Sequence, residues 1–282
     1  MIGFLLRWNA DLRTRNWGSS ADVSPPKRRG LPHYIFLLPR THCILTSRKS
    51  ARKLLSIKFE LNTKLTNVFG FVADTYVRSF NSNKTWASTV ARTRPNLFPS
   101  LAKGQSPEIL WIGCSDSRCP ETMILGLQPG DVFVHRNIAN ILTPTDLNSL
   151  SVIQYAVQYL KVKHIVVSGH TKCGGVAAAM ANKKLGLIDT WLLPLRAVRR
   201  DNLKLLESLG PDEAALKLVE LNVRAGVKVL EENPIVMDAM LERGLKIHGN
   251  IYDVACGELR ELDIEEDEET VRTRKTVFKT DA

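Results

Sequence analysis

Three short apolar runs constrain the fold of this chain most strongly. They cover residues 109–113, 132–134 and 164–168, and each contains Ile or Val. Runs of this length and composition are typical of strands that are buried on both faces of a sheet. Residues 147–160, between the second and third runs, place apolar side chains at three- and four-residue steps, which indicates a helix. The pattern therefore predicts an α/β fold with a mainly parallel central sheet flanked by helices.

The rest of the chain adds helices and one further strand to this expectation. A helical pattern begins near residue 65, and the polar stretch 92–107 indicates a connector. Residues 190–232 are strongly helical in pattern up to the break at Asn233-Pro234. Residues 245–254 form the last candidate strand. The acidic run 263–269 is expected to be a solvated segment.

The net charge of +10 is unevenly distributed along the chain. Residues 1–59 contain 12 of the 39 Lys and Arg residues and only two of the 29 acidic residues, Asp11 and Asp22. The remaining 27 basic and 27 acidic residues cancel, so the body of the protein is neutral. We therefore expect a basic, disordered leader over residues 1–60 and a folded domain over 61–282. A neutral body argues against a nucleic-acid partner for that domain.

The leader has the composition of a mitochondrial transit peptide, with scattered Arg, many hydroxyl residues and few acids. Its longest apolar stretch, residues 34–38, is cut by Pro39 and is too short to span a membrane. We expect a mitochondrial protein without a membrane partner, with a cytoplasmic location as the alternative. A disordered basic tail, or an arm that docks on the body or on phosphates, would share this composition.

Cysteine and histidine residues lie where predicted strands end. The five cysteines are odd in number and unevenly spaced, which argues against a disulfide scaffold. Cys114 ends the first strand, His170 ends the third, and Cys173 follows three residues later. Ligands of open α/β sheets gather outside these carboxyl ends. Two thiolates and an imidazole suit zinc and leave its fourth position open, although two buried thiols and a core histidine would give the same pattern.

An acidic and a basic residue follow Cys114 at alternate positions, Asp116 and Arg118. Arginine can hold such a carboxylate by charge-assisted hydrogen bonds. Beside a metal, the carboxylate could orient the metal-bound water, or it could bind the metal itself and close the site. An exposed ion pair of little consequence is the alternative.

The motifs together resemble those of the beta-class carbonic anhydrases, in particular the fungal and plant members. The resemblance covers residues 62–262 and rests on CSDSR (114–118), PGDVFVHRNIAN (129–140), GHTKCGG (169–175) and LKIHGNIYDVACGEL (245–259). It implies one zinc ion per subunit, bound by Cys114, His170 and Cys173. It also implies that Asp116 and Arg118 form the catalytic pair.

The same resemblance implies a substrate pocket and an oligomer. The pocket residues would be Gln105, Phe133, Ile138, Tyr155 and Gly174. Tyr155 would reach across a dimer interface, and an N-terminal helical arm would serve in dimerisation. The family forms homodimers or multiples of dimers. This sequence departs from the family's pattern at two positions, since Asn250 stands where an aromatic residue is expected and Cys119 is an additional thiol that we interpret as a bystander.

The implied reaction is the reversible hydration of carbon dioxide to bicarbonate and a proton by a zinc-bound hydroxide. Two thiolate ligands would make the bound water less acidic than three histidines would, so activity should rise toward alkaline pH. His135 and His164 are candidate proton relays, although structural roles are favoured for both. The alternatives are a carbon disulfide or carbonyl sulfide hydrolase on the same scaffold, or a zinc-stabilised scaffold whose basic arm binds nucleic acid.

Overall fold

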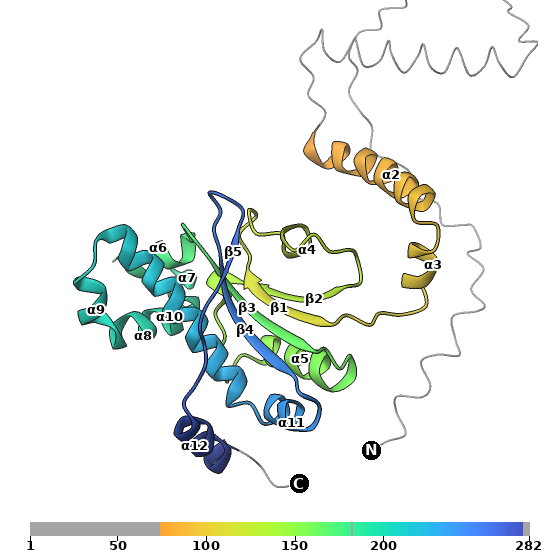
Figure 1. The fold of residues 1–282 in the computed structure, drawn as a ribbon. Coiled ribbons are helices and arrows are strands. Elements are labelled where there is room, and N and C mark those ends of the chain that lie inside the picture. The colour runs from red at the N-terminus through yellow and green to blue at the C-terminus, as the bar shows by residue number, and fades with distance from the viewer. Residues whose placement is uncertain (1–73, 182, 279–282) are drawn as a thin grey trace, which may run out of the picture. The chain divides into compact units, whose positions relative to one another are not determined.

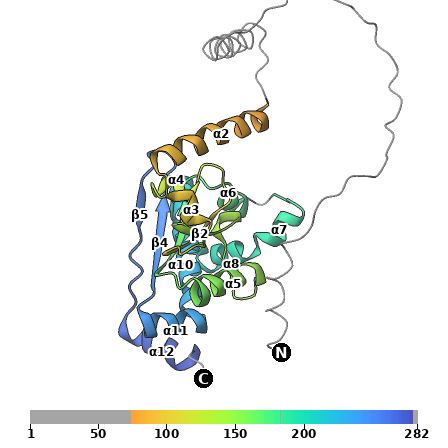
Figure 2. The same cartoon turned by 90° about the vertical axis from the view of Figure 1, so that its right-hand side faces the viewer.

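The apolar runs form neighbouring strands of one sheet in the computed structural model, which describes residues 74–181 and 183–278. The sheet has the order β2-β1-β3-β4-β5, and the first four of these strands are parallel. Their bounds are β1 Ile109–Cys114, β2 Val132–Asn137, β3 His164–His170 and β4 Lys246–Tyr252. The short β5, Leu259–Glu261, runs antiparallel to β4 at the sheet edge (Figure 2). The predicted mainly parallel α/β fold is confirmed.

Strand register brings the carboxyl ends of the parallel strands to one edge of the sheet. Cys114 pairs with Asn137 at the end of β2, and Gly113 pairs with Ser168 of β3. His170 pairs with Tyr252, the last residue of β4. The final residues of β1 and β3 therefore lie at the same edge, where sequence reasoning placed the metal ligands.

Helices account for most of the remaining described chain (Figure 1). Helices α6 to α10 gather on one side of the sheet, and α10 packs directly against β3 and β4. A 3₁₀ turn follows β2 and a π-helical turn extends α5. The helical bounds are α2 Thr75–Thr93, α3 Leu97–Leu101, α4 Glu121–Ile124, η1 Ile138–Asn140, α5 Leu147–Gln154, η2 Tyr155–Tyr159, α6 Gly174–Met180, α7 Leu187–Trp191, α8 Leu193–Asp201, α9 Leu203–Glu207, α10 Pro211–Glu231, α11 Pro234–Arg243 and α12 Glu268–Phe278.

The core lies between the sheet and α10. Leu110 and Ile112 of β1, and Ile165 and Val167 of β3, are fully buried. Because a strand's successive side chains point to opposite faces, burial of nearly every residue of β1 and β3 shows that both faces of the sheet are covered. The stripe that α10 turns to the core has helical spacing and comprises Leu218, Val219, Val223, Val227 and Leu230.

The break at Asn233-Pro234 has a local cause. Asn233 caps α11, because its side-chain oxygen accepts hydrogen bonds from the backbone N–H groups of Ile235 and Val236. Pro234 occupies the first helical position, where no intrahelical N–H bond is lost. Helix α10 therefore ends and α11 begins within three residues.

Three local expectations differ from the structure or lie beyond it. The polar connector contains the short helix α3. The acidic run is not simply solvated, because its residue Glu266 forms an ion pair with Arg274 of α12. Arg274 also pairs with Glu231 of α10. The helical pattern over residues 65–72, the leader and its boundary near residue 60 lie outside the described residues.

Among the helices that are described, none has the length and apolar character needed to cross a membrane.

Candidate metal centre

The side chains of Cys114, His170 and Cys173 converge at the carboxyl edge of the sheet. One ligand atom from each residue lies within 4.8 Å of the other two. Cys114 is the last residue of β1, His170 is the last residue of β3, and Cys173 directly precedes α6. All three are buried, with relative exposures of 7%, 1% and 5%. The structure therefore brings together all three predicted ligands.

The His170 ring is oriented so that one nitrogen can serve as a donor to a metal. Nδ1 lies 3.0 Å from the backbone oxygen of Thr171 and must carry the proton of that hydrogen bond. Nε2 then carries no proton and has a free lone pair. This atom is buried, and it has no hydrogen-bond partner in the described chain. Thr171 is itself held, since its hydroxyl donates to Asp253 Oδ1 at 3.0 Å. This is the outer support that metal-bound histidines usually have.

The two thiols are hydrogen-bonded to each other, and this contact shifts their pKa values in opposite directions. A hydrogen bond from Cys173 lowers the pKa of Cys114 to about 4, and the resulting thiolate raises the pKa of Cys173 above its usual range. A divalent cation that took the place of the Cys173 proton would stabilise both thiolates. Two sulfurs and one imidazole nitrogen form a zinc-type donor set with one position left for a non-protein ligand. The residues present thus fit the ion that the sequence predicts.

Asp116 and Arg118 form a bidentate ion pair beside these donors. Arg118 Nε lies 2.9 Å from Asp116 Oδ1, and Nη2 lies 2.7 Å from Oδ2. The Arg118 guanidinium holds the pKa of Asp116 well below its usual range. Asp116 Oδ2 is also 3.9 Å from His170 Nε2, so the ionised carboxylate borders the space that the three donors enclose.

Arg136 supports this loop, and sequence reasoning did not single it out. Its guanidinium donates to the backbone oxygens of Cys114 at 2.8 Å and Asp116 at 2.6 Å, and it pairs with Glu121 at 3.3 Å. These bonds fix the backbone on both sides of Ser115. Arg136 lies inside the motif at residues 129–140, but its partners are backbone atoms about twenty residues away, which no local pattern reveals.

The predicted pocket residues lie in different environments. Phe133 is half-buried on β2, and its ring centroid is 5.7 Å from that of Tyr155, which is 45% exposed. Ile138 begins the turn after β2 and packs close to Gly175, where a Cβ atom would lie 3.0 Å from Ile138 Cγ1. Gln105 is exposed in the connector before β1. The binding roles of these residues, and of Gly174 at the start of α6, remain predictions.

The turn that carries Ile138 has unusual backbone geometry. Ala139 and Asn140 adopt positive φ angles of 50° and 48°, which are uncommon for residues with a Cβ atom. Asn222 of α10 donates from Nδ2 to the backbone oxygen of Ala139 at 2.7 Å and is itself buried. The helix that covers the sheet thereby holds the turn next to the ligand cluster.

The additional thiol and the two histidines occupy distinct positions. Cys119 is buried but does not belong to the converging donor set. His135 is buried in the middle of β2, and burial lowers its pKa. His164 begins β3 whereas His170 ends it, so the two are separated by roughly 20 Å along the strand. That distance argues against His164 as a direct relay.

A cavity of about 450 Å³ opens beside the donor cluster on the side of α6 and α10. Its lining residues include Cys173, Thr171, Val176 and Val219. Lys172 and Asp212, which also line it, form an exposed ion pair at 2.9 Å. One of the two sulfur donors therefore belongs to a residue that lines this cavity.

Comparison with known proteins agrees with this geometry. The sequence profile of the family described as carbonic anhydrase matches residues 109–259, which include all three donors and the Asp116–Arg118 pair. The chain belongs to the carbonic anhydrase family. A carbonic anhydrase of Emericella nidulans is 45% identical over 197 residues, which are 69% of this chain and 86% of that protein. A carbonic anhydrase of Candida albicans is 45% identical over 192 residues, 67% of this chain and 68% of the relative.

Solved structures identify the beta class within this family. The beta-carbonic anhydrase CafA of Aspergillus fumigatus has a TM-score of 0.73 and 58% identity, covering 74% of this chain and all of that one. A structure described as one of two tetrameric beta-carbonic anhydrases from Sordaria macrospora has a TM-score of 0.66 and 54% identity, covering 67% and 98%. The expected beta-carbonic anhydrase fold and enzyme class, carbonate dehydratase, are therefore confirmed.

Proposed function

We propose that this beta-carbonic anhydrase binds one zinc ion per subunit and catalyses the reversible hydration of carbon dioxide to bicarbonate and a proton. The observation that carries the proposal is the convergence of two buried sulfurs and a buried imidazole nitrogen within 4.8 Å, beside an ionised carboxylate. That nitrogen has no hydrogen-bond partner among the residues that the structure describes. Three protein donors are the number found in catalytic zinc sites, whereas structural sites are closed by four.

When bound, zinc supplies a Lewis acid that makes water nucleophilic near neutral pH. The residues around it have separate tasks. Asp116 accepts a hydrogen bond from the attacking water and orients its lone pair toward the substrate carbon. Arg118 keeps Asp116 ionised and prevents its carboxylate from rotating, because it engages both oxygens. Arg136 fixes the backbone that carries Cys114 and Asp116.

Carbon dioxide is apolar and linear, and it needs a narrow apolar pocket rather than a charged one. Phe133, Ile138 and Tyr155 supply that surface in the proposal, and Gln105 and Gly174 offer polar groups to the substrate oxygens. The ring contact between Phe133 and Tyr155 and the position of Ile138 against the start of α6 support this assignment. A hydrolase for carbon disulfide or carbonyl sulfide has no observation of its own in its favour.

We further propose a homodimer, or a multiple of dimers, in which α2 serves as the dimerisation arm. In support, α2 has no buried residue although it is amphipathic, and Val77, Phe80 and Trp86 are 50%, 55% and 45% exposed. Charged substitutions at Phe80 and Trp86 should shift the sedimentation coefficient to that of a smaller species. A charged residue in place of Val277, on α12, serves as the control, and an unchanged assembly in the arm variant would contradict the role of α2.

For location, we propose import into mitochondria, directed by the basic leader. A relative described as mitochondrial, beta carbonic anhydrase 6 of Arabidopsis thaliana, is 33% identical over 168 residues and gives limited support. Residues 1–60 fused to a fluorescent protein should carry it into mitochondria. A fusion that stays in the cytoplasm would favour the alternative location.

The activity is tested by metal analysis together with stopped-flow hydration of carbon dioxide on the same preparation. We expect one zinc per chain and a rate that depends on it, with slower turnover of carbon disulfide and carbonyl sulfide. Stoichiometric zinc without hydration of carbon dioxide would contradict the proposed reaction while leaving the metal site intact.

A further inference from the structure

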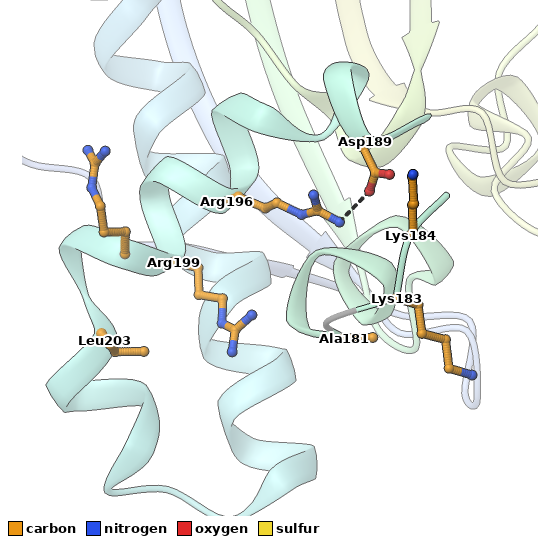
Figure 3. A pocket seen from close by; sticks show the side chains of 8 residues that line it. Ala181, Lys183, Lys184, Asp189, Arg196, Arg199 and Leu203 are labelled. Atoms are coloured by element: carbon orange, nitrogen blue, oxygen red, sulfur yellow. Dashed lines mark hydrogen bonds and ion pairs between the residues drawn. The ribbon is translucent and has the colours of Figure 1, made fainter. Parts of the chain in front are cut away.

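A second cavity, of about 680 Å³, lies away from the metal donors, where the C-terminal end of α6 approaches α7 and α8 (Figure 3). Its lining is dominated by cationic side chains. Five of them and one acid face it, namely Lys183, Lys184, Arg196, Arg199, Arg200 and Asp189.

The acidic residues near this cavity do not cancel the positive charge of the side chains that line it. The Asp189 carboxylate is already engaged, since Arg196 Nη2 donates to Oδ1 at 2.7 Å and the backbone N–H of Leu185 donates to Oδ2 at 2.7 Å. Arg200 pairs with its neighbour Asp201 at 2.8 Å. Five cations and these two carboxylates leave a net charge of about +3 around the cavity, a field that favours anions.

Three of the cations have no acidic partner within ion-pair distance among the described residues. Lys183 and Lys184 are exposed at the rim, and Arg199 donates to the backbone oxygen of Ala179 at 3.1 Å instead of to a carboxylate. In Figure 3 a dashed line joins Arg196 to Asp189, whereas none joins Lys183, Lys184 or Arg199 to an acid. Their positive charges are therefore available to a ligand.

Two of the three arginines, Arg196 and Arg199, are half-buried and held by hydrogen bonds, whereas Arg200 is exposed. Arg196, Arg199 and Arg200 occupy positions three and four residues apart on α8, so they share one face of the helix. Leu195, directly before Arg196, is fully buried and anchors α8 to the body. The hydrogen bonds of Arg196 and Arg199 further fix these half-buried guanidinium groups. Little conformational entropy remains to be lost when a ligand binds them.

We infer that this cavity is a binding site for a small, multiply charged anion that carries phosphate groups. Guanidinium groups match phosphate oxygens in geometry, and lysines at a rim add charge without demanding a fixed orientation. The cavity volume falls within the range of sites for small ligands and exceeds what one inorganic phosphate needs. Compounds with two phosphate groups therefore fit its charge and size better than a single phosphate.

The site is distinct from the metal centre although one helix connects them. Cys173 directly precedes α6, and Ala181, which lines the cavity, directly follows it. The length of this helix separates the two by about 10 Å. Binding can therefore be measured directly, without relying on catalytic activity.

Isothermal titration calorimetry of the full zinc-loaded chain with inorganic pyrophosphate tests the inference. Inorganic phosphate and sodium chloride of matched ionic strength are titrated in parallel. We expect saturable binding of about one pyrophosphate per chain, weaker binding of phosphate, and no saturable heat with chloride. The double substitution Lys183→Ala and Lys184→Ala should weaken pyrophosphate binding by about tenfold, because two unpaired charges are lost at short range.

Matched variants separate a local site from a general charge effect. Lys103→Ala with Lys275→Ala removes the same charge from two exposed positions elsewhere, and it should leave the affinity unchanged. Lys183→Arg with Lys184→Arg keeps the charge and should restore binding. Absence of saturable binding, or equal affinity in the wild type and the Lys183/Lys184 alanine variant with folding verified by circular dichroism, would overturn the inference.

Discussion

Arg118 engages both carboxylate oxygens of Asp116, with donor–acceptor distances of 2.9 Å to Oδ1 and 2.7 Å to Oδ2. The backbone N–H of Arg118 donates to the same Oδ1 at 3.0 Å. A further bond from Arg118 Nη2 to the backbone oxygen of Lys172 links the pair to the turn that carries His170 and Cys173. The carboxylate is thus ionised, oriented and tied to both halves of the donor cluster.

Replacing Asp116 by Asn removes the charge and keeps the shape of the side chain. An amide cannot accept two charge-assisted hydrogen bonds from Arg118, and it is a weaker acceptor for the attacking water. We expect carbon dioxide hydration to fall by about 100-fold or more while zinc stays bound. Asp212→Asn, which breaks the exposed pair with Lys172, is the control and should keep normal turnover. Normal turnover in the zinc-loaded Asp116→Asn variant would exclude the proposed role.

Removing one sulfur donor should empty the site. Cys173→Ala leaves two protein ligands, and we expect zinc affinity to fall by much more than the 10–100-fold that loss of an outer-shell partner causes. Inductively coupled plasma mass spectrometry of the purified variant measures the zinc content. Cys256→Ala, at an exposed thiol, should retain one zinc per chain. Full zinc occupancy in Cys173→Ala would show that this sulfur is not a ligand.

Gly169, directly before His170, is tightly enclosed by α10. A Cβ atom at Gly169 would lie 2.6 Å from Val219 Cγ1 and 2.9 Å from Val223 Cγ2, whereas one at Gly174 would meet nothing within 4 Å. We expect Gly169→Ala to lower the free energy of unfolding by about 1–3 kcal/mol through overpacking. Gly174→Ala is the matched control for stability. Equal thermal midpoints for the two variants would contradict the close packing of α10 on β3.

Glu231 is expected to make stability depend on pH near neutrality. Burial, followed by repulsion from Glu266, raises its pKa from 4.5 to about 7. Because the folded state holds this proton more tightly than the unfolded state does, the unfolding free energy should fall as pH rises from about 4.5 to 7. Arg274 and residual solvent limit the effect to about 1–2 kcal/mol. Thermal unfolding of Glu231→Gln across this range should show a flatter pH profile, and an identical profile would contradict the shift.

The parallel strands and the metal ligands could be predicted from sequence because their signals are local. Each strand is a continuous apolar run, and Cys114 and His170 come at the ends of two such runs. Parallel pairing then places those ends at one edge, and Cys173 follows His170 by only three residues, so topology alone brings the three ligands together.

The features that could not be predicted depend on contacts between distant residues. β5 has three residues, two of them exposed, so it shows no apolar pattern of its own and forms by pairing with β4. Helix α12 buries no residue and is held through ion pairs of Arg274. Arg136 donates hydrogen bonds to backbone oxygens, and side-chain contacts with the backbone cannot be recognised from the spacing of residue types. The short helix α3 lies in a polar segment that lacks a helical pattern.

Zinc K-edge X-ray absorption of the full-length protein tests the central claim most directly. We predict a coordination shell with two sulfurs at about 2.3 Å, one imidazole nitrogen at about 2.0–2.1 Å and one further light-atom ligand. A shell of three or four sulfurs, which would bring Cys119 into the site, or a spectrum without sulfur, would contradict an open Cys114–His170–Cys173 centre.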